Sequence, residues 1–203
     1  MLSPQNPLGF PPQRGRGRKA LARGLLGLAA LSVGLSSAPA SDTVTCHTNA
    51  SYVVIEGKNE DSGGHKYLVQ TKATPDAKIS CDYKPAKGDF EIDGSDDAYY
   101  FLGLRDHILV LDGGTSPVRS LYIYDLKNWS KIFEATMSRE DLVVSEQGVS
   151  FWMQTDKGTP RNCKKYKQYA KDLLNAAIET YSTYDFATAE IHKSDETRCI
   201  PVK

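Results

Sequence analysis

The sequence lacks the short motifs that assign a function at once. It contains no C-x-x-C pair, no H-E-x-x-H, no P-loop and no G-x-S-x-G elbow. Thioredoxin-like redox chemistry, zincin proteolysis, P-loop nucleotide binding and α/β-hydrolase catalysis therefore lose support. No apolar run approaches the roughly 20 residues that span a bilayer.

Acidic residues are absent from the first 40 positions, although the chain has 25 of them in 203 residues. This region holds five basic residues, then the apolar run 24–35, then Ala38-Pro39-Ala40. A positive region, a short apolar region and a small-x-small site form a secretory signal peptide. We predict that residues 1–40 are cleaved and that residues 41–203 form one globular domain, soluble and without a stable membrane span, in the periplasm or the extracellular space.

Removal of the leader changes the charge of the protein. The leader holds 5 of the 25 basic residues and no acidic one, so the remainder carries 20 basic and 25 acidic residues, a net charge of −5. A mildly acidic domain gives no support for nucleic-acid binding.

All four cysteines follow the predicted cleavage site, and an even number in an exported chain indicates disulfides. Four cysteines allow three pairings. We predict Cys46–Cys81 and Cys163–Cys199, because each bridge would close a loop of about 35 residues and tie one end of the domain to itself.

Residues 43–156 have a strong β pattern, with turn-forming residues between short runs of β-branched and aromatic residues. In 120–126, Leu121 and Ile123 alternate with Tyr122 and Tyr124, which predicts a strand covered on both faces. The fold class expected is mainly β (α+β), an antiparallel meander or a sandwich-like sheet. The expected strands are 51–56, 66–72, 98–104, 107–112, 120–126, 131–136, 141–145 and 148–155.

The C-terminal part predicts one amphipathic helix that packs on the sheet. Apolar residues recur at three- and four-residue steps, which predicts a helix over about 163–181. Asn162 is the expected N-cap. A terminal strand is expected over 184–192.

Asp89, Glu91 and Asp93, followed by Gly94, resemble in spacing the first half of a calcium loop, where alternate carboxylates converge on a hard cation. The position that would complete an EF-hand loop holds Tyr100. The alternative is a strand with its acidic residues in solvent and an Asp-Gly turn. Apart from this Ca²⁺ candidate, the sequence predicts no cofactor.

Three features are candidate binding residues. Lys164 and Lys165 belong to a local basic patch that suits an anionic polysaccharide, lipid head group or acidic protein. Gly113 and Gly114 open a loop between strands, and loops on rigid sheets often bind partners. Trp129 lies in a turn and is a candidate interface anchor. Each also has a structural interpretation: a solvated helix face, a hairpin connection and a packed side chain.

Three functions are compatible with these patterns. The first is a non-enzymatic binding or inhibitory module with a protein or cell-envelope polymer as partner. The second is a cell-envelope polymer hydrolase that uses paired carboxylates among Asp89–Asp97, Asp106 and Asp112, with His107 next to Asp106. The third is a structural envelope protein. We rank them in that order because no catalytic motif is present.

Overall fold

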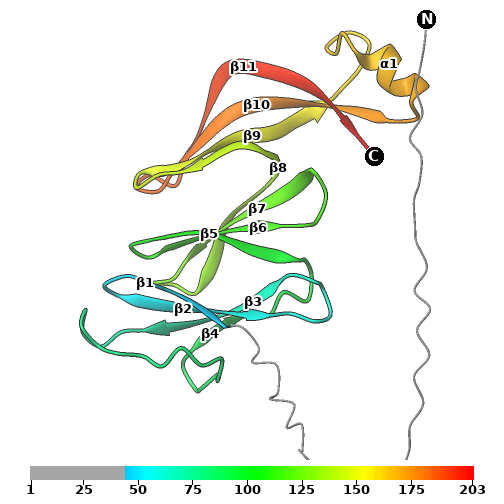
Figure 1. The fold of residues 1–203 in the computed structure, drawn as a ribbon. Coiled ribbons are helices and arrows are strands. Elements are labelled where there is room, and N and C mark those ends of the chain that lie inside the picture. The colour runs from blue at the N-terminus through cyan, green and yellow to red at the C-terminus, as the bar shows by residue number, and fades with distance from the viewer. Residues whose placement is uncertain (1–43) are drawn as a thin grey trace, which may run out of the picture. The chain divides into compact units, whose positions relative to one another are not determined.

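The computed structural model describes residues 44–203, and the predicted signal peptide lies outside this region. Eleven strands and one helix make up the described region (Figure 1). They are β1 (Thr45–Thr48), β2 (Tyr52–Lys58), β3 (His65–Thr71), β4 (Phe90–Ile92), β5 (Tyr99–Arg105), β6 (Ile108–Gly113), β7 (Val118–Asp125), β8 (Ser130–Val144), β9 (Gly148–Lys157), α1 (Tyr166–Lys171), β10 (Asn175–Asp185) and β11 (Ile191–Val202).

The strands form one antiparallel sheet in the order β1-β2-β3-β5-β6-β7-β8-β9-β10-β11, and β4 pairs with β3 beside this path. Apart from β4, neighbours in the sheet are thus neighbours in the sequence. The predicted antiparallel meander is confirmed. Short hairpin connections produce this order, because an antiparallel pair needs only a few residues to join its strands.

Two expected strands form one continuous element. The predicted segments 131–136 and 141–145 are both part of β8, which runs for 15 residues. Its pairing with β9 is irregular between Ser138 and Val143, and Asp141 there has φ 59°. An Asp adopts this left-handed conformation more easily than most residues. The strand therefore bends at Asp141 instead of ending.

Strands β6 and β7 lie between two hydrophobic clusters. Leu109, Leu111, Tyr122 and Tyr124 face the first cluster. Their neighbours in sequence face a second cluster, which includes Ile108, Val110, Leu121 and Ile123. The prediction that 120–126 is covered on both faces is confirmed. It follows from period-two alternation with large apolar or aromatic residues at each position from Leu121 to Tyr124.

The first half of the sheet curls around the first cluster. Phe90 in β4 lies 6.2 Å from the ring of Tyr124 in β7 and 5.3 Å from that of Trp129, measured between centroids. The side chain of Asn49, in the β1–β2 turn, donates a hydrogen bond of 2.6 Å to the carbonyl of Asp106. Strands far apart in the sheet order are thereby brought together.

The second half closes over the opposite face. A Cβ atom added to Gly103 in β5 would lie 3.1 Å from Val144 at the end of β8, so this strand crosses close to β5. Phe133 in β8 and Tyr184 in β10 have centroids 4.6 Å apart inside the second cluster. This crossing positions the turns described below.

The predicted helix is correct in existence but wrong in extent. The helix α1 spans only Tyr166–Lys171, and Lys165, not Asn162, is its N-cap residue. Residues 175–185 form β10, which pairs with both β9 and β11. Their β-branched and aromatic residues favour a strand once hydrogen-bond partners lie on both sides. The terminal strand predicted over 184–192 is also wrong, because residues 186–190 turn between β10 and β11.

Both predicted disulfides are confirmed: Cys46 is bonded to Cys81 and Cys163 to Cys199. Disulfides form and persist in oxidising compartments. No helix in residues 44–203 has the length and apolar character needed to cross a membrane.

Candidate functional site

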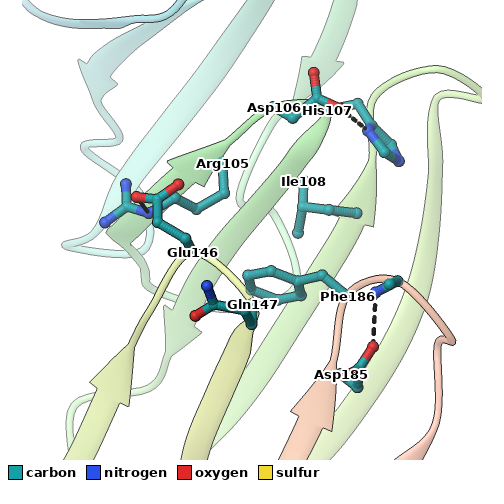
Figure 2. Close-up of a pocket in the computed structure, with 9 residues that line it drawn as sticks. Arg105, Asp106, His107, Ile108, Glu146, Gln147, Asp185 and Phe186 are labelled. Atoms are coloured by element: carbon teal, nitrogen blue, oxygen red, sulfur yellow. Dashed lines mark hydrogen bonds and ion pairs between the residues drawn. The ribbon is translucent and has the colours of Figure 1, made fainter.

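Three hairpin turns converge around a pocket of about 340 Å³. They are the β5–β6, β8–β9 and β10–β11 turns. A volume of this size lies at the lower end of the range for small-molecule sites. The lining residues, most of them labelled in Figure 2, are Arg105, Asp106, His107, Ile108, Glu146, Gln147, Asp185, Phe186 and Ala187.

The β5–β6 turn consists of Asp106 and His107. Asp106 has φ 46°, a conformation that Asp tolerates better than most residues. The ring atom Nδ1 of His107 lies 2.7 Å from Oδ2 of Asp106, and Nε2 lies 4.0 Å from Oδ1 of Asp125. The imidazole is thus held between two carboxylates at the rim of the pocket.

The β8–β9 turn is fixed by Ser145 and Gly148. The hydroxyl of Ser145 accepts hydrogen bonds from the N–H groups of Gln147 and Gly148 at 3.2 and 3.1 Å. A Cβ on Gly148 would lie 2.2 Å from the carbonyl oxygen of Tyr184, so only glycine fits where β9 meets β10. The N–H of Phe186 donates to the carbonyl of Gln147 at 2.9 Å, which joins this turn to the third one.

The β10–β11 turn is built on Asp185. One carboxylate oxygen accepts hydrogen bonds from the N–H groups of Ala187 and Thr188 at 2.8 and 2.9 Å. The side chain of Asp185 therefore replaces a backbone acceptor, as Asp commonly does in turns. The turn holds Phe186 toward the pocket.

The floor of the pocket is apolar and its rim is charged. Ile108 belongs to the second hydrophobic cluster, and Phe186 packs against it. Figure 2 shows the Phe186 ring pointing into the middle of the site, between Ile108 and Gln147. Across the rim, Nε of Arg105 lies 2.9 Å from a carboxylate oxygen of Glu146. The pocket is the open end of the second cluster.

Two carboxyl groups of the pocket have pKa values below the ordinary value. The hydrogen bond with His107 lowers the pKa of Asp106. Backbone N–H groups of Thr188 and Ala187 lower the pKa of Asp185. Both groups are deprotonated at neutral pH, so neither acts as a general acid there. The lining contains no Ser, Thr, Cys, Lys or Tyr that would serve as a nucleophile.

The candidate residues Trp129, Gly113 and Gly114 lie outside this pocket. Trp129 is half-buried and packs edge-on against Tyr52 in the first cluster, with centroids 6.3 Å apart. A Cβ on Gly113 would lie 2.4 Å from a carboxylate oxygen of Asp97, and Gly114 has φ 97°. Local packing and backbone geometry therefore account for both glycines.

Lys164 and Lys165 line a separate cavity of about 390 Å³, together with Arg198 and Cys199. The guanidinium of Arg198 is already neutralised: it donates to Glu179 at 2.7 Å and to Glu140 at 2.8 Å. The two lysines carry the uncompensated charge of this cavity. The structure thus separates the five candidate binding residues into distinct places.

The predicted calcium ligands each have a local partner. Asp89 accepts hydrogen bonds from Gln70 and from a backbone N–H, and Glu91 accepts one from Tyr83 at 3.3 Å. Asp93 accepts from the N–H of Ser95, which lowers its pKa. Within residues 44–203, no three His, Cys, Asp or Glu side chains are placed to hold a metal ion.

Asp112, a candidate carboxylate for hydrolysis, is fully buried. Both of its oxygens accept hydrogen bonds from Arg119, at 2.9 and 3.1 Å, and Arg139 lies 3.4 Å away. Burial raises the pKa of this carboxyl, and the two guanidiniums oppose the rise. Asp112 is a structural ion-pair partner and lines none of the pockets described here.

Sequence reasoning missed a histidine pair at the other end of the sheet. His47 in β1 and His65 in β3 flank Glu56 in β2, and each ring forms a hydrogen bond with one of its carboxylate oxygens. The spacing of these residues along the chain contains no signal for this cluster. It arises only from strand register, which pairs His47 with Val54 and Glu56 with Tyr67.

Arg105, Glu146, Asp185 and Phe186 were also missed as pocket residues. Arg105 and Glu146 stand in or next to turns that the sequence did indicate. Asp185 and Phe186 belong to the β10–β11 turn, which a correct prediction of that hairpin would have revealed. No protein-family model, curated protein or solved structure matches this chain.

Proposed function

We propose that this protein is an exported binding module whose pocket between three hairpin turns accepts an apolar group of a partner, such as an aromatic side chain. The observation that carries the proposal is the apolar floor of Ile108 and Phe186, open to solvent at the end of the second hydrophobic cluster. Pockets with an apolar lining and a few fixed polar groups are typical binding sites.

The charged groups of the rim favour binding over catalysis. Arg105 is paired with Glu146, Asp106 with His107, and Asp185 with its own turn. These pairs fix the shape of the site. Backbone groups and the side-chain amide of Gln147 remain to orient a bound group. The hydrolase alternative finds less support, because it needs a carboxylic acid that stays protonated.

The two disulfides support the exported location, since such bridges are rare in reducing compartments. The predicted signal peptide supports it independently. A small β-rich domain with rigid turns presents a preorganised surface, which lowers the entropic cost of association.

The proposal is tested with indole as a probe, by following backbone amide signals during an NMR titration. We expect shifts centred on Ile108, Gln147 and Phe186, with a dissociation constant on the order of millimolar, as for other small fragments. Ala187→Trp, at an exposed turn position that lines the pocket, fills the site and abolishes the shifts.

The matched control is Ala73→Trp, also at an exposed position, in the loop after β3. It leaves indole binding unchanged. Shifts scattered over the surface, or shifts that persist in Ala187→Trp, would show that the pocket does not bind and would overturn the proposal.

A further inference from the structure

The segment between β9 and β10, residues 158–174, has a charge that differs from the rest of the protein. We call it the β9–β10 excursion. From Lys157 at the end of β9 to Lys171, fifteen residues carry six cations and no acid, and Asp172 is the one acidic residue of the excursion. Outside these fifteen, residues 41–203 carry 14 basic and 25 acidic residues, a net charge of −11. The segment is therefore locally positive within an otherwise acidic domain.

These cations are free to meet a partner. All six are exposed, and none forms an ion pair with a carboxylate of residues 44–203. They are Lys157, Arg161, Lys164, Lys165, Lys167 and Lys171. Elsewhere in the described region, several basic side chains, such as Arg119 and Arg198, are paired.

An exposed leucine accompanies the cations. Leu173 is 92% exposed, the highest value among the large apolar residues exposed in the described region. It lies two residues beyond α1, after the C-cap residue Asp172, and has φ 58°, which favours glycine or asparagine over leucine. This position suits neither the backbone nor the side chain of leucine, and contact with a partner outside the chain would explain the residue.

The excursion is held firmly on the sheet. Cys163 is buried and bonded to Cys199 in β11. The hydroxyl of Tyr169 donates to the carbonyl of Cys199 at 3.4 Å, and the N–H of Gly158 donates to the carbonyl of Ala176 at 2.8 Å. Figure 1 shows α1 and its flanking loops beyond the end of β9. Cations and leucine are thus presented on a fixed support.

We propose that the β9–β10 excursion docks the protein onto the surface of an anionic lipid membrane, with Leu173 inserted among the head groups. Basic clusters are attracted to anionic leaflets, and a neighbouring apolar side chain adds the hydrophobic contribution of interfacial binding. The cavity beside Lys164 and Lys165 has room for a phosphate head group. The exposed leucine favours this partner over a soluble acidic polymer, which would use the cations alone.

Sedimentation with vesicles of phosphatidylcholine and phosphatidylglycerol tests the proposal, with pure phosphatidylcholine vesicles for comparison. We expect binding to the anionic vesicles only, weakened by salt. Each lysine near an anionic surface contributes a factor of about five, so Lys164→Gln/Lys165→Gln lowers binding about 25-fold. Lys78→Gln/Lys87→Gln, at exposed sites without an ion pair in the loop before β4, is the matched control and changes little.

Leu173→Asn separates lipid from polymer binding. Asparagine adopts the left-handed conformation of this position readily, so the fold is kept while the inserted side chain is lost. We expect about a tenfold loss of vesicle binding. Val143→Ser, at the next most exposed large apolar residue of the described region, is the control and retains binding.

Three results would overturn the proposal. The first is equal binding to both kinds of vesicle or to neither. The second is vesicle binding that Leu173→Asn leaves unchanged. The third is preferential binding to a soluble sulfated polysaccharide, with the same dependence on Lys164 and Lys165, which would assign the excursion to an acidic polymer. The pocket variant Ala187→Trp is expected to retain vesicle binding, so this test is independent of the proposed function.

Discussion

Two disulfide bonds each tie one segment to the sheet, and the two segments differ in what their side chains do. The Cys46–Cys81 bond ties the β3–β4 loop, residues 72–89, to β1, and the Cys163–Cys199 bond ties the β9–β10 excursion to β11. The two sequence separations are 35 and 36 residues. What each tied segment does with its side chains differs.

The β3–β4 loop completes a core. Ile79 and Tyr83 pack against Val53, Ile55 and Leu68, which form a third hydrophobic cluster. The helix of the β9–β10 excursion, by contrast, buries none of its residues. The Cys46–Cys81 bond therefore holds a loop over an apolar cluster, and the Cys163–Cys199 bond holds a segment whose helix stays unburied.

The largest expected effect is the loss of a disulfide. Loop closure over about 35 residues stabilises the folded state by about 4 kcal/mol. Cys163→Ser/Cys199→Ser should lose about this amount. Cys46→Ser/Cys81→Ser should lose a further 1–3 kcal/mol or so, because the third cluster is then uncovered. Urea unfolding of the two double variants, with comparable slopes, measures the difference.

Equal losses in the two double variants would contradict the comparison. They would mean that Ile79 and Tyr83 contribute no packing beyond what the bond itself fixes. A vesicle-binding measurement on Cys163→Ser/Cys199→Ser adds a second criterion, because release of the β9–β10 excursion should weaken membrane docking even where the fold persists.

A smaller effect is expected at mildly acidic pH. It arises in β1 to β3, at the end of the sheet that holds the Cys46–Cys81 bond. His47 follows Cys46 in β1 and stacks on Phe101, with ring centroids 3.5 Å apart. Burial lowers the pKa of His47 and of His65 below the ordinary value of 6.5. Below that pH the unfolded chain binds protons that the folded chain does not. The free energy of unfolding therefore falls as the pH decreases from 6.5 toward the two lowered pKa values.

Urea midpoints at neutral and mildly acidic pH measure this loss. His47→Gln/His65→Gln should flatten the pH dependence, whereas His192→Gln, at an exposed position in β11, should retain it. A midpoint that rises toward acid pH would show that Glu56 stabilises charged histidines instead, which reverses the sign.

The sequence alone predicted most of the sheet, because its information is local. Period-two alternation and turn residues located β2, β3 and β5 to β9, whereas β4 was only the alternative to a calcium loop. Alternation within residues 120–126 also predicted the two covered faces. The helical periodicity over 163–181 misled for a physical reason. Ala177, Ile178 and Tyr181 satisfy both a helical spacing and a strand, and the pairing of β10 with two neighbours decides between them.

The pocket could not be predicted from local sequence patterns. Asp106 and Phe186 are 80 residues apart in the sequence, and they meet because β8 bends at Asp141 and its end crosses β5 near Gly103. Nothing in the sequence near Asp141 predicts the direction of that bend. Lys164 and Lys165 could be selected as candidates from the sequence because a run of cations without acids is a local feature that needs no fold to be visible.

The smallest expected effect concerns the stability of the β9–β10 excursion itself. Leu173 occupies a left-handed conformation and is 92% exposed, so it contributes strain and almost no burial. Leu173→Asn should therefore raise the free energy of unfolding, by up to about 1 kcal/mol. Ile79→Asn in the β3–β4 loop should lower it, because a half-buried apolar side chain is lost. If urea unfolding shows that the two substitutions change the free energy of unfolding in opposite directions, the β3–β4 loop completes a core and the β9–β10 excursion does not. Destabilisation by both substitutions would mean that the excursion also completes a core. The role of Leu173 would then be structural, and membrane docking would not explain its exposure.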